Sequence, residues 1–248
     1  MVYVNRDNYR GLFKPRLCQP RFHWEIARAE TGLRAIDHIV GNVRENEMNL
    51  WAEYFNKTMD FETFIDFGPG DIGTKYSALL SKVVRTKNSA IRNPINEPYE
   101  GLKKSQIQEF IEQYRGSGVQ HIAIRTNDIL KTIPAMRSNG VEFLTIPDTY
   151  YDRLNERRAN GDLQIDEDVA DLQKHGILCD TEGNGYLLQL FTKPIGDRPT
   201  FFFEIIQRKG ESYGFGKGNF QALFESIELD QKLRGNLDYE PSDVIPPC

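Results

Sequence analysis

AIDHIVGNV, residues 35–43, returns further along the chain in altered form as GVQHIAIRT, residues 118–126. Each segment is a short apolar run of the kind that forms a β-strand, and each carries a histidine followed by an isoleucine near its centre. Two such segments within 248 residues indicate an internal repeat, so the elements that follow each copy should also correspond.

The elements that follow the two copies correspond in type and order. A helical pattern comes first in each half, at 46–59 with Leu50, Trp51, Tyr54 and Phe55 on one face, and at 127–139 with Leu130, Ile133 and Met136 at similar spacing. Apolar, strand-like runs come next, at 60–67 and 75–84 in the first half and at 140–146, 175–191 and 200–207 in the second. The sequence therefore predicts an α+β fold of two βαβββ modules, at about 34–116 and 117–208.

The remaining segments are predicted to lie outside this repeat. Residues 1–33 are irregular and are expected to form an amino-terminal arm or linker. Residues 147–174 interrupt the second module and predict two short surface helices. Residues 217–234 predict a closing helix whose apolar residues, at i, i+3, i+4 and i+7, include Phe220. Residues 34–237 are thus expected to form the catalytic domain, followed by a flexible tail at 238–248.

Composition excludes several classes of protein. Lysine and arginine number 31 against 36 acidic residues, and no basic tract stands out, so a nucleic-acid partner is not expected. No apolar stretch is long enough for a membrane span. The three cysteines are scattered, with neither disulfide-framework nor zinc-site spacing, and a reducing cytoplasm is the expected compartment.

Three residues could together hold a metal ion. His38 and His121 occupy equivalent positions in the two modules, and Glu204 interrupts TFFFEII, the most apolar run of the chain. A strand histidine is more often a core residue with hydrogen-bond partners, and Glu204 could alternate outward into solvent. The combination of all three favours a metal site, because a buried carboxylate needs a compensating charge. Two imidazoles and one carboxylate are the ligand set of non-haem Fe(II) oxygenases.

Several longer motifs are similar to one known family. IDHIVGNV, PINEP, KSQIQEF, GVQHIAI, PDTYYDRL, LLQLFTKP, DRPTFFFEIIQRKG and GFGKGNFQALFESIE resemble the catalytic half of the 4-hydroxyphenylpyruvate dioxygenases, over about residues 3–237. That family belongs to the vicinal oxygen chelate superfamily. The resemblance implies paired βαβββ modules that form an open β-barrel around a metal, with a carboxy-terminal lid helix.

The resemblance also implies an activity and its residues. It implies Fe(II) as cofactor and conversion of 4-hydroxyphenylpyruvate and O₂ to homogentisate and CO₂, a step of tyrosine and phenylalanine catabolism. The implied iron ligands are His38, His121 and Glu204. Catalytic roles are implied for Asn96, Gln120, Gln189 and Phe220, and the implied substrate pocket consists of Ser81, Asn96, Gln106, Gln120, Gln189, Phe191, Phe202, Phe215, Asn219 and Phe220.

Several alternatives stay open at this point. A 4-hydroxymandelate synthase would share the substrate, the fold and the ligands, and an extradiol ring-cleaving dioxygenase would share the ligand types. Members of the resembled family also carry a second, amino-terminal domain without the metal, whereas this resemblance begins near the link between the domains. An excised or naturally short domain that binds metal without completing the reaction is therefore a further alternative, and association into a homo-oligomer is compatible with the sequence.

Overall fold

The computed structural model describes residues 30–68, 78–99, 104–196, 198–219, 222 and 225–227. The chain divides into two compact units, Met1–Glu30 and Thr31–Cys248, and every described element belongs to the second unit. The predicted arm and tail and most of the predicted closing helix, Phe220 included, lie outside the described residues. No described helix is long and apolar enough to cross a membrane.

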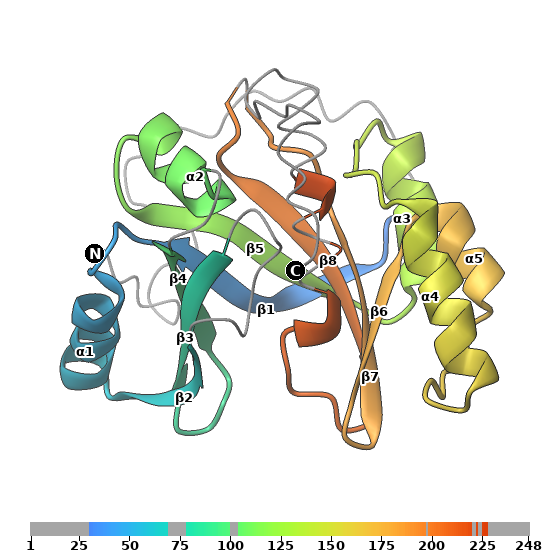
Figure 1. The fold of residues 1–248 in the computed structure, drawn as a ribbon, viewed down its shortest axis with the longest axis horizontal. Helices are drawn as coiled ribbons and strands as arrows, with labels where there is room; N and C mark the ends of the chain where they lie inside the picture. The colour runs from blue at the N-terminus through green and yellow to red at the C-terminus, as the bar shows by residue number, and fades with distance from the viewer. Residues whose placement is uncertain are drawn as a thin grey trace, which may run out of the picture. The chain divides into compact units, whose positions relative to one another are not determined.

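Each module folds as one βαβββ unit (Figure 1). The first consists of β1 (Leu33–Asn42), α1 (Met48–Met59), β2 (Phe61–Phe67), β3 (Ala78–Thr86) and β4 (Arg92–Tyr99). The second consists of β5 (Gly118–Thr126), α3 (Ile129–Ser138), β6 (Leu178–Glu182), β7 (Gly185–Phe191) and β8 (Phe202–Lys209). The duplicated α+β fold predicted from the sequence is thereby confirmed.

The eight strands form one sheet whose order shows the duplication. The order is β2-β3-β4-β1-β5-β8-β7-β6, so the modules meet where β1 pairs antiparallel with β5. On either side of this junction the neighbouring strand is parallel, β4 beside β1 and β8 beside β5. The sheet curls as an open half-barrel, and its central strands are the two that carry the repeated His-Ile pair (Figure 1).

The insert in the second module forms two helices, as the sequence predicted. They are α4 (Asp148–Ala159) and α5 (Val169–His175), which lie beside α3 (Figure 1). Tyr151 and Leu154 of α4 and Leu172 of α5 are fully buried, in the larger hydrophobic core, which also contains Ile133 of α3. The insert is therefore part of the core of the second module rather than an appendage on its surface.

Three local features differ from the sequence predictions or were absent from them. The run at 140–146 is not a strand and makes only a single bridge, Phe143 to Thr192, because its apolar side chains pack into the helical side of the core. The helix α2 (Gln106–Tyr114) was not predicted, although the Ser105 side chain caps its start by accepting from the Gln108 amide. Residues 217–219 form a short 3₁₀ helix, η1 (Lys217–Asn219).

Helix α1 buries only part of the apolar face predicted from the sequence. Its buried residues are Met48 and Ala52, which pack in a small core with Phe61 of β2. The larger apolar face is exposed, at 63% for Leu50 and 42% for Tyr54. Phe55 of the predicted face does pack against this core, so the helical period was predicted correctly and the buried face only in part.

Candidate metal centre

The candidate ligands come from the three strands at the centre of the sheet. His38 lies on β1, His121 on β5 and Glu204 on β8. In the strand register Ala123 pairs with His38 of β1 and with Glu204 of β8, and His121 lies two residues before Ala123 on β5. The side chains of His38, His121 and Glu204 therefore leave the same face of the sheet. Ala123 is fully buried, and its small side chain leaves space between His38 and Glu204.

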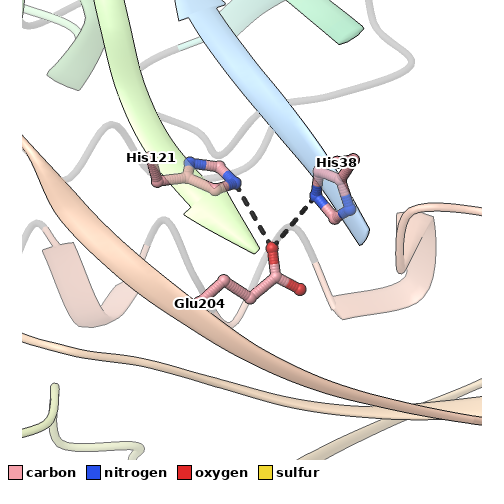
Figure 2. A group of neighbouring side chains, drawn as sticks. All are labelled: His38, His121 and Glu204. Atoms are coloured by element: carbon pink, nitrogen blue, oxygen red, sulfur yellow. Dashed lines mark ion pairs between the residues drawn. The ribbon is translucent and has the colours of Figure 1, made fainter. Parts of the chain in front are cut away.

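The three side chains converge on one point (Figure 2). Glu204 Oε2 lies 3.2 Å from His38 Nε2 and 3.3 Å from His121 Nε2, and all three residues are buried. Ligand atoms that sit about 2.1 Å from one ion, at roughly right angles, are separated by about 3 Å, which is close to these distances. The donor set and its spacing thus fit a divalent transition metal.

The residue before each histidine holds that ring from the other side. His38 Nδ1 lies 3.0 Å from Asp37 Oδ1, and His121 Nδ1 lies 3.0 Å from Gln120 Oε1. An acceptor at Nδ1 keeps the proton there and leaves Nε2 free to bind a metal. Phe202 stacks on the His121 ring at a centroid distance of 4.9 Å and further limits its rotation.

The ionisation of the cluster follows from burial and mutual charge. Burial alone would raise the pKa of Glu204, but the positive charge and hydrogen bonds of the two histidines lower this pKa to about 2. Burial alone would lower the pKa of His38, but Glu204 and Asp37 raise it above its ordinary value. Burial lowers the pKa of His121, and Glu204 offsets this effect only in part. A metal ion would therefore take the place of the proton on His38.

A cavity opens beside the three candidate ligands. Ser81, Asn96, Gln106 and Gln120 give it polar groups, and Phe191 and Phe215 give it aromatic ones. A few oriented polar groups in a mostly apolar lining are typical of a small-molecule site. Nine of the residues singled out in the sequence therefore meet here: His38, Ser81, Asn96, Gln106, Gln120, His121, Phe191, Glu204 and Phe215.

Three of the remaining predicted pocket residues, Phe202, Gln189 and Asn219, are not part of this cavity lining. Phe202 lines a neighbouring cavity that shares Gln106 and Gln120 with the first. Gln189 is buried, and its Oε1 has no hydrogen-bond partner among the described residues. Asn219 is held by the hydroxyl of Tyr150 at 2.8 Å, outside the cavity lining, and Phe220 cannot be placed because it lies outside the described residues.

Sequence reasoning missed most of the apolar lining. The missed residues are Val40, Phe67, Leu79, Val83, Pro94 and Ile107. Four of them could have been predicted from the sequence. Each lies two positions from a predicted site residue on the same strand and so shares its face: Val40, Leu79, Val83 and Pro94. Asn42 was missed too: it is fully buried, its Oδ1 lies 3.5 Å from the Asn96 amide, and its own Nδ2 has no partner in the described part of the chain.

Comparison with known proteins gives a consistent family. Residues 35–157 match the Glyoxalase/Bleomycin resistance protein/Dioxygenase superfamily. The chain is 49% identical over 243 residues to 4-hydroxyphenylpyruvate dioxygenase of Caenorhabditis briggsae, covering 96% of this chain and 61% of that protein. It is 44% identical to the enzyme of that name from Dictyostelium discoideum, covering 95% of this chain and 65% of the relative. The chain thus spans about three fifths of the length of the curated relatives that it matches.

Among solved structures, a triple mutant of 4-hydroxymandelate synthase from Streptomyces coelicolor superposes with a TM-score of 0.71 at 30% identity. The match covers 83% of this chain and 56% of the synthase. The sheet order and the three candidate ligands agree with these matches, which extend along nearly the whole chain. The chain is thus similar to the 4-hydroxyphenylpyruvate dioxygenases over 95–96% of its length, and residues 35–157 match the Glyoxalase/Bleomycin resistance protein/Dioxygenase superfamily.

Proposed function

We propose that this chain is the catalytic part of an Fe(II)-dependent dioxygenase that converts 4-hydroxyphenylpyruvate and O₂ to homogentisate and CO₂, a step of tyrosine breakdown in the cytoplasm. The observation that carries the proposal is the convergence of His38, His121 and Glu204 at the wall of a cavity with polar and aromatic lining residues. The names of the curated relatives support the choice of substrate.

The ligands fit iron in kind and in number. Two imidazole nitrogens and one carboxylate oxygen on one side leave the cavity side free for exogenous ligands, the arrangement typical of non-haem Fe(II) oxygenases. A bound ferrous ion would supply the one-electron chemistry with O₂ that no amino-acid side chain provides. Its charge would also remove the cost of burying ionised Glu204, whose pKa of about 2 keeps it a carboxylate at neutral pH.

The polar lining can orient a substrate that carries a phenol, a ketone and a carboxylate. Ser81 and Asn96 lie opposite each other on β3 and β4 and present a hydroxyl and an amide to the same side of the cavity. Gln120 accepts from the His121 ring through Oε1, so its amide nitrogen remains to donate to a ligand. These groups position the substrate rather than exchange electrons with it.

The aromatic lining supplies packing and excludes water. Phe191 lies opposite Glu204 in the strand register and meets the His121 ring edge-on, at a centroid distance of 6.1 Å. Phe215 meets the His38 ring edge-on at 5.1 Å. The two phenylalanines thus flank the histidines, where they would hold an aromatic substrate ring and keep bulk water from the ligands.

A second candidate function is 4-hydroxymandelate synthesis. The structural similarity to a 4-hydroxymandelate synthase favours it, because the two chains superpose with a TM-score of 0.71. The two functions differ only in which carbon atom of the substrate is hydroxylated, so the product distinguishes them directly. The higher identity to the dioxygenases, 49% against 30%, favours homogentisate.

Product analysis tests the proposal. The purified chain is stripped of metal, reloaded with Fe(II), and given 4-hydroxyphenylpyruvate in air, and the products are identified by chromatography and mass spectrometry. Homogentisate is expected, whereas 4-hydroxymandelate would establish the second candidate. His121→Ala serves as the ligand-deficient control. Iron binding without either product would contradict the proposal for this chain on its own and favour a metal-binding but incomplete domain.

A further inference from the structure

A buried ion cluster lies directly behind His38. The Asp37 carboxylate is fully buried and contacts His38 Nδ1 on one side and two arginines on the other. Arg208 binds it through Nε and Nη2, at 3.0 Å to Oδ2 and 2.8 Å to Oδ1, and Arg125 binds it through Nε at 3.0 Å. Burial opposes ionisation of Asp37, but the hydrogen bonds from His38 and Arg208 outweigh it and lower its pKa far below the ordinary range.

Arg208 reaches a second group that Arg125 does not. Its remaining nitrogen, Nη1, donates to the Gly214 carbonyl at 2.6 Å and to the Ser212 carbonyl at 3.4 Å. Among the described residues, the hydrogen bonds of the Arg125 side chain all go to Asp37, and that side chain is 45% exposed against 8% for Arg208. A guanidinium has two edges with donors, and Arg208 uses one edge for the carboxylate and the other for the backbone.

The backbone that Arg208 holds carries Phe215 onto the metal centre. The Phe215 ring meets the His38 imidazole edge-on, with centroids 5.1 Å apart and an interplanar angle of 84°, and the Arg208 guanidinium lies 5.9 Å from the Phe215 ring centroid. His38 is thus held at Nδ1 by Asp37 and on its ring by Phe215. Arg208 contacts Asp37 and lies beside the Phe215 ring, so it adjoins both partners of His38.

We propose that Arg208 is a positioning residue that joins the Asp37–His38 pair to residues 212–215, so that the ligand ring and the aromatic wall of the cavity are held by one guanidinium. The inference rests on the proposed metal-binding role of His38 but not on turnover. Its experiment therefore measures metal affinity and backbone protection, and a failure to make homogentisate would leave the outcome unaffected.

The test compares the same replacement at two arginines that share Asp37. Arg208→Lys keeps a positive charge beside Asp37 but cannot bind the carboxylate in a bidentate manner and the two carbonyls together, whereas Arg125→Lys is the matched control. In the metal-free protein, amide hydrogen exchange at residues 212–216 is expected to rise at least about tenfold in Arg208→Lys, and to stay within about twofold in Arg125→Lys.

Metal affinity is measured by titration with Co(II), which is monitored by calorimetry and by the visible absorption bands of the bound ion. Loss of an outer partner of a metal ligand lowers affinity about 10- to 100-fold, and Arg208→Lys is expected to fall at the lower end of this range. Asp37→Asn should reproduce the loss of affinity with a smaller rise in exchange, because the contacts of Arg208 to the carbonyls remain. Equal effects of the two lysine variants, or unchanged affinity in folded Arg208→Lys, would overturn the proposal.

Phe215→Leu keeps the proposal testable if Arg208→Lys does not fold. This variant leaves the buried ions paired and removes the aromatic ring that contacts His38 and faces the Arg208 guanidinium. Co(II) affinity is expected to fall severalfold, while exchange at residues 212–214 stays unchanged because Arg208 still holds them. Unchanged affinity in Phe215→Leu would remove the aromatic part of the link and refute the coupling.

Discussion

Replacement of Gly216 by alanine tests how the segment after β8 is seated over the sheet. Gly216 has a φ of 73°, in the left-handed region, and a Cβ at this position would lie 2.6 Å from Oε1 and 2.8 Å from Nε2 of Gln189. Such distances are shorter than van der Waals contact, and Gln189 is only 1% exposed, so its amide has little room to move. Either the amide must shift or the segment must lift away.

The expected cost has two parts. The left-handed conformation costs an alanine about 1 kcal/mol. Overpacking against a buried side chain adds about 1–3 kcal/mol, for a total of roughly 3 kcal/mol. Gly161→Ala is the matched control, because Gly161 also has a left-handed φ, of 80°, but a Cβ there would meet nothing within 4 Å. The control should lose only the backbone part, about 1 kcal/mol.

The assay is thermal and urea unfolding of the metal-free protein. For a chain of this size each kcal/mol lowers the Tm by roughly 2–4 °C. We therefore expect a fall of about 6–12 °C for Gly216→Ala and about 2–4 °C for Gly161→Ala. Equal losses in the two variants would refute the reasoning, because they would show that Gly216 is not seated against Gln189.

Three further predictions concern the metal, a buried hydroxyl and a buried thiol. His121→Ala should weaken Fe(II) or Co(II) binding about a hundredfold or more, because one of three ligands is lost. His175→Ala is the control and should leave the affinity unchanged. Near-normal affinity in titrations of His121→Ala would contradict the ligand assignment. Tyr150→Phe should lower the free energy of unfolding by about 1–3 kcal/mol in urea titrations, because the Tyr150 hydroxyl hydrogen-bonds to the buried backbone N–H and C=O of Cys179. Tyr54→Phe, at an exposed site, is the control and should have almost no effect. Burial raises the pKa of the Cys179 thiol to about 12, so in a variant whose other two cysteines are serine the native protein should resist iodoacetamide at pH 8. Because the native pKa lies above the unfolded value of 9.0, this thiol contributes stability that is complete below pH 9 and is lost as the pH rises towards 12; fast alkylation of the native protein at pH 8 would show that the thiol is accessible.

The parts of the fold that the sequence predicted are those that depend on local pattern. The two copies of the His-Ile strand, the helix after each copy and the apolar runs that follow identified the modules, because strand and helix periods are visible in a single chain. The same periods indicate which residues share a face but not which face meets the core. The apolar face predicted for α1 therefore includes Phe55, which packs against the core, but also Leu50 and Tyr54, which are exposed.

Contacts between distant residues account for most of what the sequence did not predict in the site. Asp37 and Arg208 are 171 residues apart, and no local pattern joins them. Gln189 was singled out as a pocket residue, but its place below Gly216 depends on a segment that returns over the sheet. Val40 and Pro94, by contrast, could have been inferred from His38 and Asn96, because every second residue of a strand shares a face.

The symmetry of the sheet explains why the metal centre has an open side. The pseudo-twofold axis between β1 and β5 exchanges His38 with His121 and Val40 with Ala123, as their cross-strand pairs show. Glu204 lies beside Ala123, so its symmetry mate lies beside Val40. Gly41 pairs with Ile95, and continuing this register by one residue puts Pro94 there.

Pro94 therefore stands where a perfect duplication would supply a second carboxylate. Two histidines and two carboxylates would close the ligand set, as four protein ligands do in structural metal sites. Proline offers no ligand atom, and it lines the cavity together with Val83 and Asn96. Because the second module has a carboxylate at this position and the first has Pro94, the side of the candidate metal centre that faces the cavity has no fourth protein ligand from the repeat.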